Sequence, residues 1–265
     1  MVFNPSMELA RRQLLVALGA SLAAALARQA GAHAAQRLGS TRLDLNSWAR
    51  SGLQATDGGL VASVFGLEPG LADEVLLPAT RLDALPDGYA PRDLVDTRSA
   101  GIPAEGSQRI RALVVPDARR LIASASEAGY DLYVGSGFRS QAYQAQVFAA
   151  QTARFGDPET AERYSARPGH SQHQLGTTID FTSTFRGFRG SDAAGWLQAH
   201  AHEFGFVLPY TPASQACTGY IDEPWHARWV GLALAASLQG LGYQSWTDQC
   251  ADDAVAAVRA TAGLA

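Results

Sequence analysis

The sequence predicts an α+β fold. Several segments carry apolar residues at helical spacing, while others are short runs with the alternation of a strand. The two kinds of segment do not follow one another in the regular β–α order that a doubly wound parallel sheet requires. The 265 residues contain no internal repeat, and they suffice for one large or two small domains.

Residues 1–34 have the features of an export signal. Arg11 and Arg12 precede an apolar run at 14–27, which is short for a bilayer-spanning helix, and Ala32-His33-Ala34 is a small-x-small cleavage site. The Arg pair followed by Gln-Leu-Leu suggests the twin-Arg route. An ordinary secretory signal fits equally well, and a retained amphipathic anchor is a third reading. We therefore expect export to the periplasm, cell envelope or medium, with membrane contact only through an uncleaved signal.

Residues 35–84 are the least informative part of the chain. Asp57-Gly-Gly59 and Pro69-Gly70 predict turns, and the apolar residues between them follow no sustained helical or strand period. This region is therefore either a linker or a small lobe. Residues 85–95 follow as an extended strap, because two prolines and a glycine disfavour a helix there. The main domain is expected over 85–265.

The order of elements within this domain can be predicted from periodicity and breakers. A helix is expected over 109–128, divided by Pro116 as the first residue of its second part and stopped by Gly129. Ser140 is positioned to cap a helix over 141–155. The remaining expectations are strands at 130–134, 177–181 and 206–210, a connector at 157–167, a helix at 196–204, and two Ala-rich packing helices at 231–241 and 252–262.

Composition excludes several kinds of chemistry. The sequence contains no Lys, so it has no Walker A lysine, no pyridoxal Schiff base and no Ser-x-x-Lys peptidase motif. Residues 1–34 hold three of the 21 basic and one of the 25 acidic residues, so the remainder has a net charge of −6, which argues against nucleic-acid binding. Cys217 and Cys250 are too few for a thiolate zinc cluster; in an exported protein we expect one disulfide, with two buried thiols as the alternative.

Two polar segments, Ser171–Asp180 and Glu223–His226, carry the pattern of a metal site. Strand parity over 177–181 places Asp180 on the face opposite the apolar Ile179. A hydrolytic zinc takes three nitrogen or oxygen ligands and keeps one position for water. His173, Asp180 and His226 are the candidate ligands, which leaves Glu223 as a general base. The alternative is that these residues are ordinary surface or hydrogen-bonded groups.

Together with Ser136–Ser140, Pro168–Ser171 and Glu223–Gly231, these segments resemble the VanY-type zinc D-Ala-D-Ala peptidases. The wider group includes lysostaphin-like peptidoglycan peptidases and the Hedgehog signalling domain. The resemblance covers about 85–231, with one departure at Thr178, where a small residue is usual. It implies a small central antiparallel sheet that carries one zinc ion per chain and is flanked by helices.

The resemblance also implies roles for individual residues. Arg139 matches the residue that polarises the scissile carbonyl, although a structural ion pair is the alternative. Ser171 and Gln144 match positions that hydrogen-bond the terminal carboxylate or the backbone of the substrate; Ser171 can equally only shape its turn. Glu223 and His226 would point to opposite faces of a regular strand, so a bend near Pro224 is required.

We therefore expect an exported zinc carboxypeptidase that releases D-Ala from the D-Ala-D-Ala ends of peptidoglycan stem peptides. The alternatives are an endopeptidase or L,D-carboxypeptidase of the same fold, and a Hedgehog-like zinc domain that binds without catalysis. Among the other residues near these motifs, His170 is a candidate for the rim of the site. Trp225 and Trp229 are expected to pack beneath the metal.

Overall fold

The computed structural model describes residues 74–75, 77–182, 184–232, 235–236 and 239. The predicted export signal, residues 35–73 and 76 of the predicted linker or lobe, and the predicted helix at 252–262 lie outside these residues. Of the predicted helix at 231–241, the described positions Leu232, Ala235, Ala236 and Gln239 are helical. No helix within the described ranges is long and apolar enough to cross a membrane.

A three-stranded antiparallel sheet lies at the centre of the described domain. Its strands are β3 (Thr178–Asp180), β4 (Phe206–Val207) and β5 (His226–Trp229), in the order β3-β5-β4. A second antiparallel pair joins β1 (Leu94–Asp96) to β2 (Arg109–Arg111). The expected α+β class with a small antiparallel sheet is confirmed.

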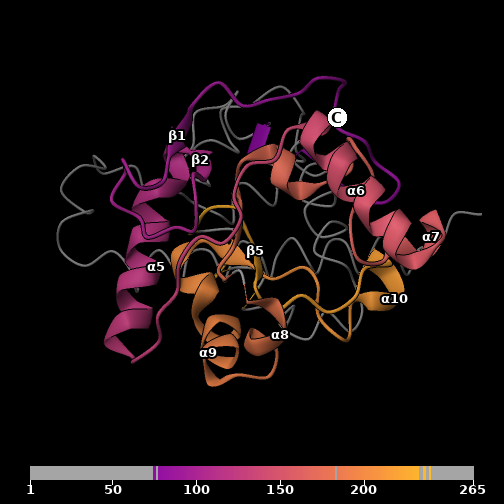
Figure 1. The fold of residues 1–265 in the computed structure, drawn as a ribbon. Coiled ribbons are helices and arrows are strands. Elements are labelled where there is room, and N and C mark those ends of the chain that lie inside the picture. The colour runs from indigo at the N-terminus through magenta and orange to yellow at the C-terminus, as the bar shows by residue number, and fades with distance from the viewer. Residues whose placement is uncertain (1–73, 76, 183, 233–234, 237–238, 240–265) are drawn as a thin grey trace, which may run out of the picture.

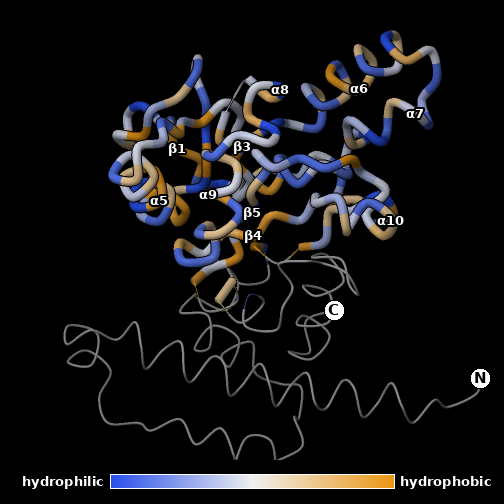
Figure 2. The backbone as a smooth tube through the Cα atoms, turned by 90° about the horizontal axis from the view of Figure 1, so that it is seen from below, coloured by the Kyte–Doolittle hydropathy of each residue, from blue (hydrophilic) through white to orange (hydrophobic). Residues whose placement is uncertain are grey.

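Helices flank the central sheet on two sides. In Figure 1, α5 (Val115–Glu127) lies at one side of β5, and α6 (Gln141–Phe155) and α7 (Pro158–Glu162) lie at the other. Hydrophobic and hydrophilic positions alternate along α5 in Figure 2, as expected for a helix with one buried face. The remaining helical elements are η1 (Ala112–Val114), η2 (Gln172–Leu175), α8 (Phe185–Phe188), α9 (Asp192–His200), η3 (Ala201–Phe204) and α10 (Gln215–Thr218).

The main hydrophobic core lies between α5, α9 and the central sheet. Leu121 of α5, Leu197 of α9 and Ile179 of β3 are all fully buried within it. Trp229 of β5 packs into the same core and donates its indole N–H to the buried carboxylate of Asp117, 2.9 Å away. The expected packing role of Trp229 is therefore confirmed.

The predicted helix over 109–128 is only partly correct. Its first residues form β2, where Ile110 lies opposite Val95, and η1 follows. Pairing with β1 outweighs local helical spacing here, an effect that periodicity cannot detect. The helix α5 begins at Val115, and Pro116 lies in its first turn, where a missing N–H has no cost.

The strand predicted at 130–134 is wrong, the strand predicted at 206–210 is too long, and the predicted connector at 157–167 contains a helix. Within 130–134 only Val134 pairs, as an isolated bridge to Ala104. The strand expected over 206–210 ends at Val207, because Pro209 has no N–H to extend the ladder. The connector at 157–167 contains α7, which Asp157 caps by accepting a hydrogen bond from the Thr160 N–H.

The helix predicted over 141–155 is confirmed with the same bounds as α6. The Ser140 side chain accepts a hydrogen bond from the Tyr143 N–H, as expected of an N-cap. Cys217 is disulfide-bonded. Cys250 lies outside the described residues, so the pairing of these two cysteines stays a prediction.

Candidate metal centre

The three predicted ligands come from three elements that meet at one end of the central sheet. His173 lies in η2, Asp180 ends β3, and His226 begins β5. The β3–β5 register places Asp180 directly opposite His226. All three residues are buried, and one ligand atom from each lies within 4.8 Å of the others. This triad is therefore a group that can hold a metal ion.

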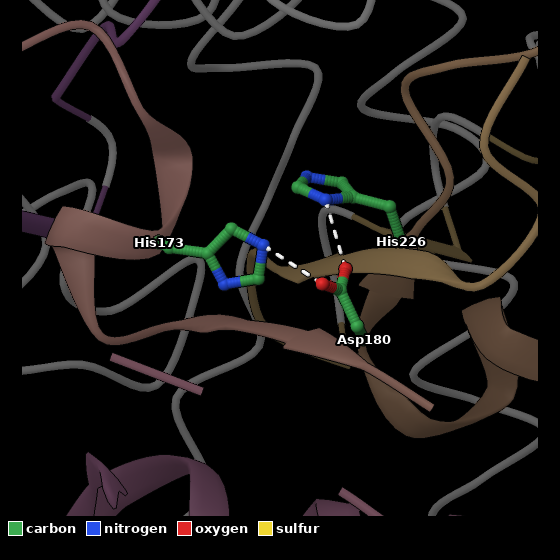
Figure 3. A group of neighbouring side chains, drawn as sticks. All are labelled: His173, Asp180 and His226. Carbon is green, nitrogen blue, oxygen red and sulfur yellow. Dashed lines mark ion pairs between the residues drawn. The ribbon is translucent and has the colours of Figure 1, made fainter. Parts of the chain in front are cut away.

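Both imidazole rings direct a nitrogen toward the Asp180 carboxylate (Figure 3). His173 Nε2 lies 3.3 Å from Asp180 Oδ2, and His226 Nδ1 lies 3.2 Å from Asp180 Oδ1. Burial lowers the pKa of His226 to about 4, so its imidazole is neutral near pH 7 and retains a lone pair. Two imidazole nitrogens and one carboxylate oxygen form the donor set of a hydrolytic zinc site.

Hydrogen bonds on the far side of each ring select the ligating nitrogen. His173 Nδ1 lies 2.8 Å from the Gly137 carbonyl oxygen, which only accepts, so Nδ1 carries the proton and Nε2 faces Asp180 with a lone pair. His226 Nε2 lies 3.1 Å from Gln172 Oε1, which leaves Nδ1 free of its proton. Sequence reasoning missed Gln172, since its contact with His226 joins residues 54 positions apart.

The carbonyl of Gly137 reaches His173 because residues 135–137 are hydrogen-bonded to β3. The Asp180 N–H donates to the Ser136 carbonyl at 2.8 Å, and the Gly135 N–H donates to the Asp180 carbonyl at 2.8 Å. A Cβ at Gly137 would collide with the carbonyl oxygen of Arg109. A residue without a side chain is therefore required where this turn passes β2.

Arg139 follows this turn and contacts the triad directly. Its Nη2 donates to Asp180 Oδ2 at 3.0 Å, and its Nε donates to Ser136 Oγ at 2.9 Å. Burial would raise the pKa of Asp180, but its neighbours, among them the positively charged Arg139, outweigh burial and hold that pKa below its usual value. Arg139 thus takes part in an ion pair and also lies at the wall of the cavity described below.

Glu223 lies beside the triad, as predicted. Its Oε2 is 3.7 Å from His226 Nδ1. The required bend is present: the His226 N–H donates to the Glu223 carbonyl at 3.0 Å, and β5 begins only at His226. Burial, reinforced by the negative charge of Asp180, raises the pKa of Glu223 to about 8. A cation held by the triad would oppose this shift and favour the carboxylate.

The triad opens into a cavity of about 970 Å³. Ser171 and Gln144, the two predicted substrate-binding residues, both line it. The Ser171 hydroxyl accepts from the His173 N–H at 3.3 Å, so it does shape the turn. Gln144 is fully buried and donates from Nε2 to Ala166 and Ser165, while its Oε1 has no hydrogen-bond partner in the described structure.

One of two neighbouring predictions needs correction. Trp225 is buried in the main core, as expected of a packing residue, and it also lines the cavity from the turn before β5. His170 does not line the cavity, and its Nδ1 lies 2.8 Å from the Thr80 carbonyl oxygen. Its position three residues before His173 does not bring it to the rim, since the chain turns at Gly169 and Ser171 on either side.

Comparison with known proteins identifies the family. Residues 107–232 match the family model described as VanY, D-alanyl-D-alanine carboxypeptidase. The solved structure of the LdcB LD-carboxypeptidase is 30% identical, with a TM-score of 0.56, over 64% of this chain and 83% of that one. The chain belongs to the VanY family. This agrees with the resemblance found in the sequence motifs.

Other members are similar over comparable lengths. VanYB, solved in complex with D-alanine-D-alanine, is 26% identical with a TM-score of 0.53, over 63% of this chain and 93% of that chain. A D-alanyl-D-alanine carboxypeptidase of Enterococcus faecalis is 31% identical over 144 residues, which are 51% of this VanY-family chain and 54% of the relative. The chain spans less than two thirds of the length of the curated relatives it matches.

Proposed function

We propose that the chain is an exported, zinc-dependent carboxypeptidase that removes D-Ala from peptidoglycan stem peptides ending in D-Ala-D-Ala. The observation that carries this proposal is the buried His173–Asp180–His226 triad with Glu223 beside it at the wall of one cavity. VanY-family membership and the names of the relatives support the substrate class. We assign the activity to residues 85–265 and export to residues 1–34.

The side chains of the triad fit zinc. Asp180 Oδ1 is buried and has no hydrogen-bond partner among the described residues, so an oxygen is available where the two imidazole lone pairs converge. Oxygen and nitrogen donors in this number suit zinc, and the far-side hydrogen bonds of both rings fix their orientation. Bound zinc would supply the Lewis acidity that lowers the pKa of a water molecule in the site.

The chain's own residues then account for the hydrolytic step. Glu223 accepts a proton from the water molecule while the oxygen of that water bonds to the carbonyl carbon between the two D-Ala residues. When the C–N bond breaks, Glu223 returns that proton to the leaving amine. Arg139 stabilises the negative charge that develops on the carbonyl oxygen, because its guanidinium is held in place by Ser136 and Asp180.

Ser171 and Gln144 are proposed to hold the substrate in different ways. Gln144 has only an unpartnered acceptor, Oε1, so it suits an N–H of the peptide rather than a carboxylate. Ser171 accepts from the His173 N–H and can donate its own O–H to the terminal carboxylate.

An L,D-carboxypeptidase is the second candidate, because LdcB is similar over most of its length. A binding module without catalysis is disfavoured, since it has no need of a carboxylate and a guanidinium beside the metal.

The test is to incubate the zinc-loaded protein with a stem pentapeptide ending in D-Ala-D-Ala and identify the products by mass spectrometry. We expect release of D-Ala, and no release from the same peptide ending in L-Ala. A tetrapeptide that lacks the last D-Ala is the control for L,D activity. Cleavage only of the tetrapeptide, or only at an internal bond, would contradict the D,D assignment. Failure to cleave any of these peptides would favour the binding module.

A further inference from the structure

No hydrogen bond from a described side chain fixes the carboxylate of Glu223. Among the described residues, His226 Nδ1 lies 3.7 Å from Glu223 Oε2, which is beyond hydrogen-bond distance. Its position is therefore set by its backbone. The Glu223 N–H donates to the Tyr210 carbonyl at 2.9 Å, and the flanking residues Asp222 and Trp225 lie within the same short turn.

Arg189, which directly follows α8, contacts both flanks of this turn. Its Nη1 lies 2.7 Å from Asp222 Oδ2, and its Nη2 donates to the Asp222 backbone carbonyl. Its guanidinium carbon lies 5.3 Å from the centre of the Trp225 ring. One side chain thus contacts the residue before Glu223 and the residue two after it.

A side chain of α8 itself, Phe185, also contacts Trp225. Phe185, four residues before Arg189 and on the same side of this turn of helix, packs against Trp225 with ring centres 4.8 Å apart. Trp225 is therefore contacted by both Phe185 and Arg189. Because Trp225 directly precedes the ligand His226, this packing also fixes the entry into β5.

The strength of such a contact comes from its geometry rather than its charge. An isolated exposed ion pair contributes little to stability, and the Arg189 side chain is 42% exposed. The guanidinium of Arg189 is planar. It bonds a carboxylate and a carbonyl and also lies over an indole ring, so few other orientations keep all three contacts. Arg189 is thus suited to fix a backbone turn without being important for the stability of the whole domain.

We propose that Arg189 is a positioning residue that holds the Asp222–Trp225 turn and thereby places the Glu223 carboxylate beside the metal triad. The effect on turnover rests on the proposed function; the effect on the turn does not. Arg189 also lines the cavity, so the alternative is that it binds substrate.

The experiment compares zinc-loaded full-length wild type with Arg189→Gln, Arg189→Lys and Arg120→Gln. Arg120 is a matched control on α5: it pairs with Asp117 and lies 5.9 Å over Phe204, but it does not line the cavity. We expect Arg189→Gln to lower kcat about 10- to 100-fold, since small displacements of a reacting group cost that much, with KM changed less than about threefold. Arg189→Lys keeps the charge opposite Asp222 but loses the planar contacts with the Asp222 carbonyl and the Trp225 ring, so it should recover only a small part of kcat.

Backbone hydrogen exchange gives a readout that does not depend on activity. The N–H groups of Ile221, Glu223 and His226 are all hydrogen-bonded, so exchange over 220–226 reports opening of the turn. We expect faster exchange there in Arg189→Gln and wild-type exchange in Arg120→Gln, with equal zinc content in both.

Unchanged exchange over 220–226 in Arg189→Gln would overturn the proposal, whatever the activity. Faster exchange with unchanged kcat, or a raised KM at constant kcat, would also overturn it, and the raised KM would assign Arg189 to substrate binding. If wild-type protein hydrolyses no peptide, the proposed function fails, and hydrogen exchange alone decides whether Arg189 holds the turn.

Discussion

Glu223→Gln should lower turnover of a D-Ala-D-Ala pentapeptide by about 10²- to 10⁴-fold, the usual contribution of a general base. Gln keeps the size of the side chain but cannot take a proton from water. Since the Glu223 carboxylate lies 3.7 Å from His226 Nδ1, beyond hydrogen-bond distance, the substitution should leave the metal in place. The effect should therefore fall on kcat and not on zinc content.

The measurement is kcat per bound zinc, with metal content determined on the same sample. Glu127→Gln, at the exposed end of α5, is the control for the same chemical change away from the cavity, and it should retain wild-type activity. If Glu223→Gln retains zinc and hydrolyses the peptide at nearly the wild-type rate, another residue is the base.

His226→Ala should abolish both metal binding and hydrolysis. It removes one of three ligands and leaves the buried carboxylate of Asp180 with one imidazole fewer. Loss of an outer partner of a metal ligand alone costs about 10- to 100-fold in affinity, so loss of the ligand itself should cost more than about 100-fold. Activity should fall in parallel, because no hydrolysis is expected without the ion.

Competition with a chelator of known zinc affinity measures this change. His200→Ala is the control, since His200 lies outside the cavity, where it pairs with Glu203 and stacks on Trp196. It should bind zinc as the wild type does. A His226→Ala protein that binds zinc with wild-type affinity would remove His226 from the ligand set.

Much of the site could be predicted because its residues lie in short, regular segments. Strand parity placed Asp180 on the polar face of the predicted strand that became β3. Strand geometry requires a bend near Pro224 if Glu223 and His226 are to face one site, as the family resemblance implies, and the bend is present. Strand parity and a bend at a proline depend on residues adjacent in the sequence, which explains why the sequence alone can predict them.

The unpredicted parts depend on contacts between distant residues. Gln172 orients His226 across 54 positions, and Arg189 reaches Asp222 across 33. Arg109–Arg111 became a strand because β1 pairs with it, although its own spacing is helical. Periodicity has no access to such pairings, so the sequence predicts which residues the site uses better than it predicts what holds them there.

Titration of metal-free wild-type protein with zinc, with release of D-Ala from the pentapeptide as the readout, tests the central claim most directly. We expect no hydrolysis without metal and a linear rise that saturates at one zinc per chain, since the His173–Asp180–His226 triad can hold one ion. Hydrolysis by protein shown to be free of metal, or saturation only at two zinc ions per chain, would contradict it.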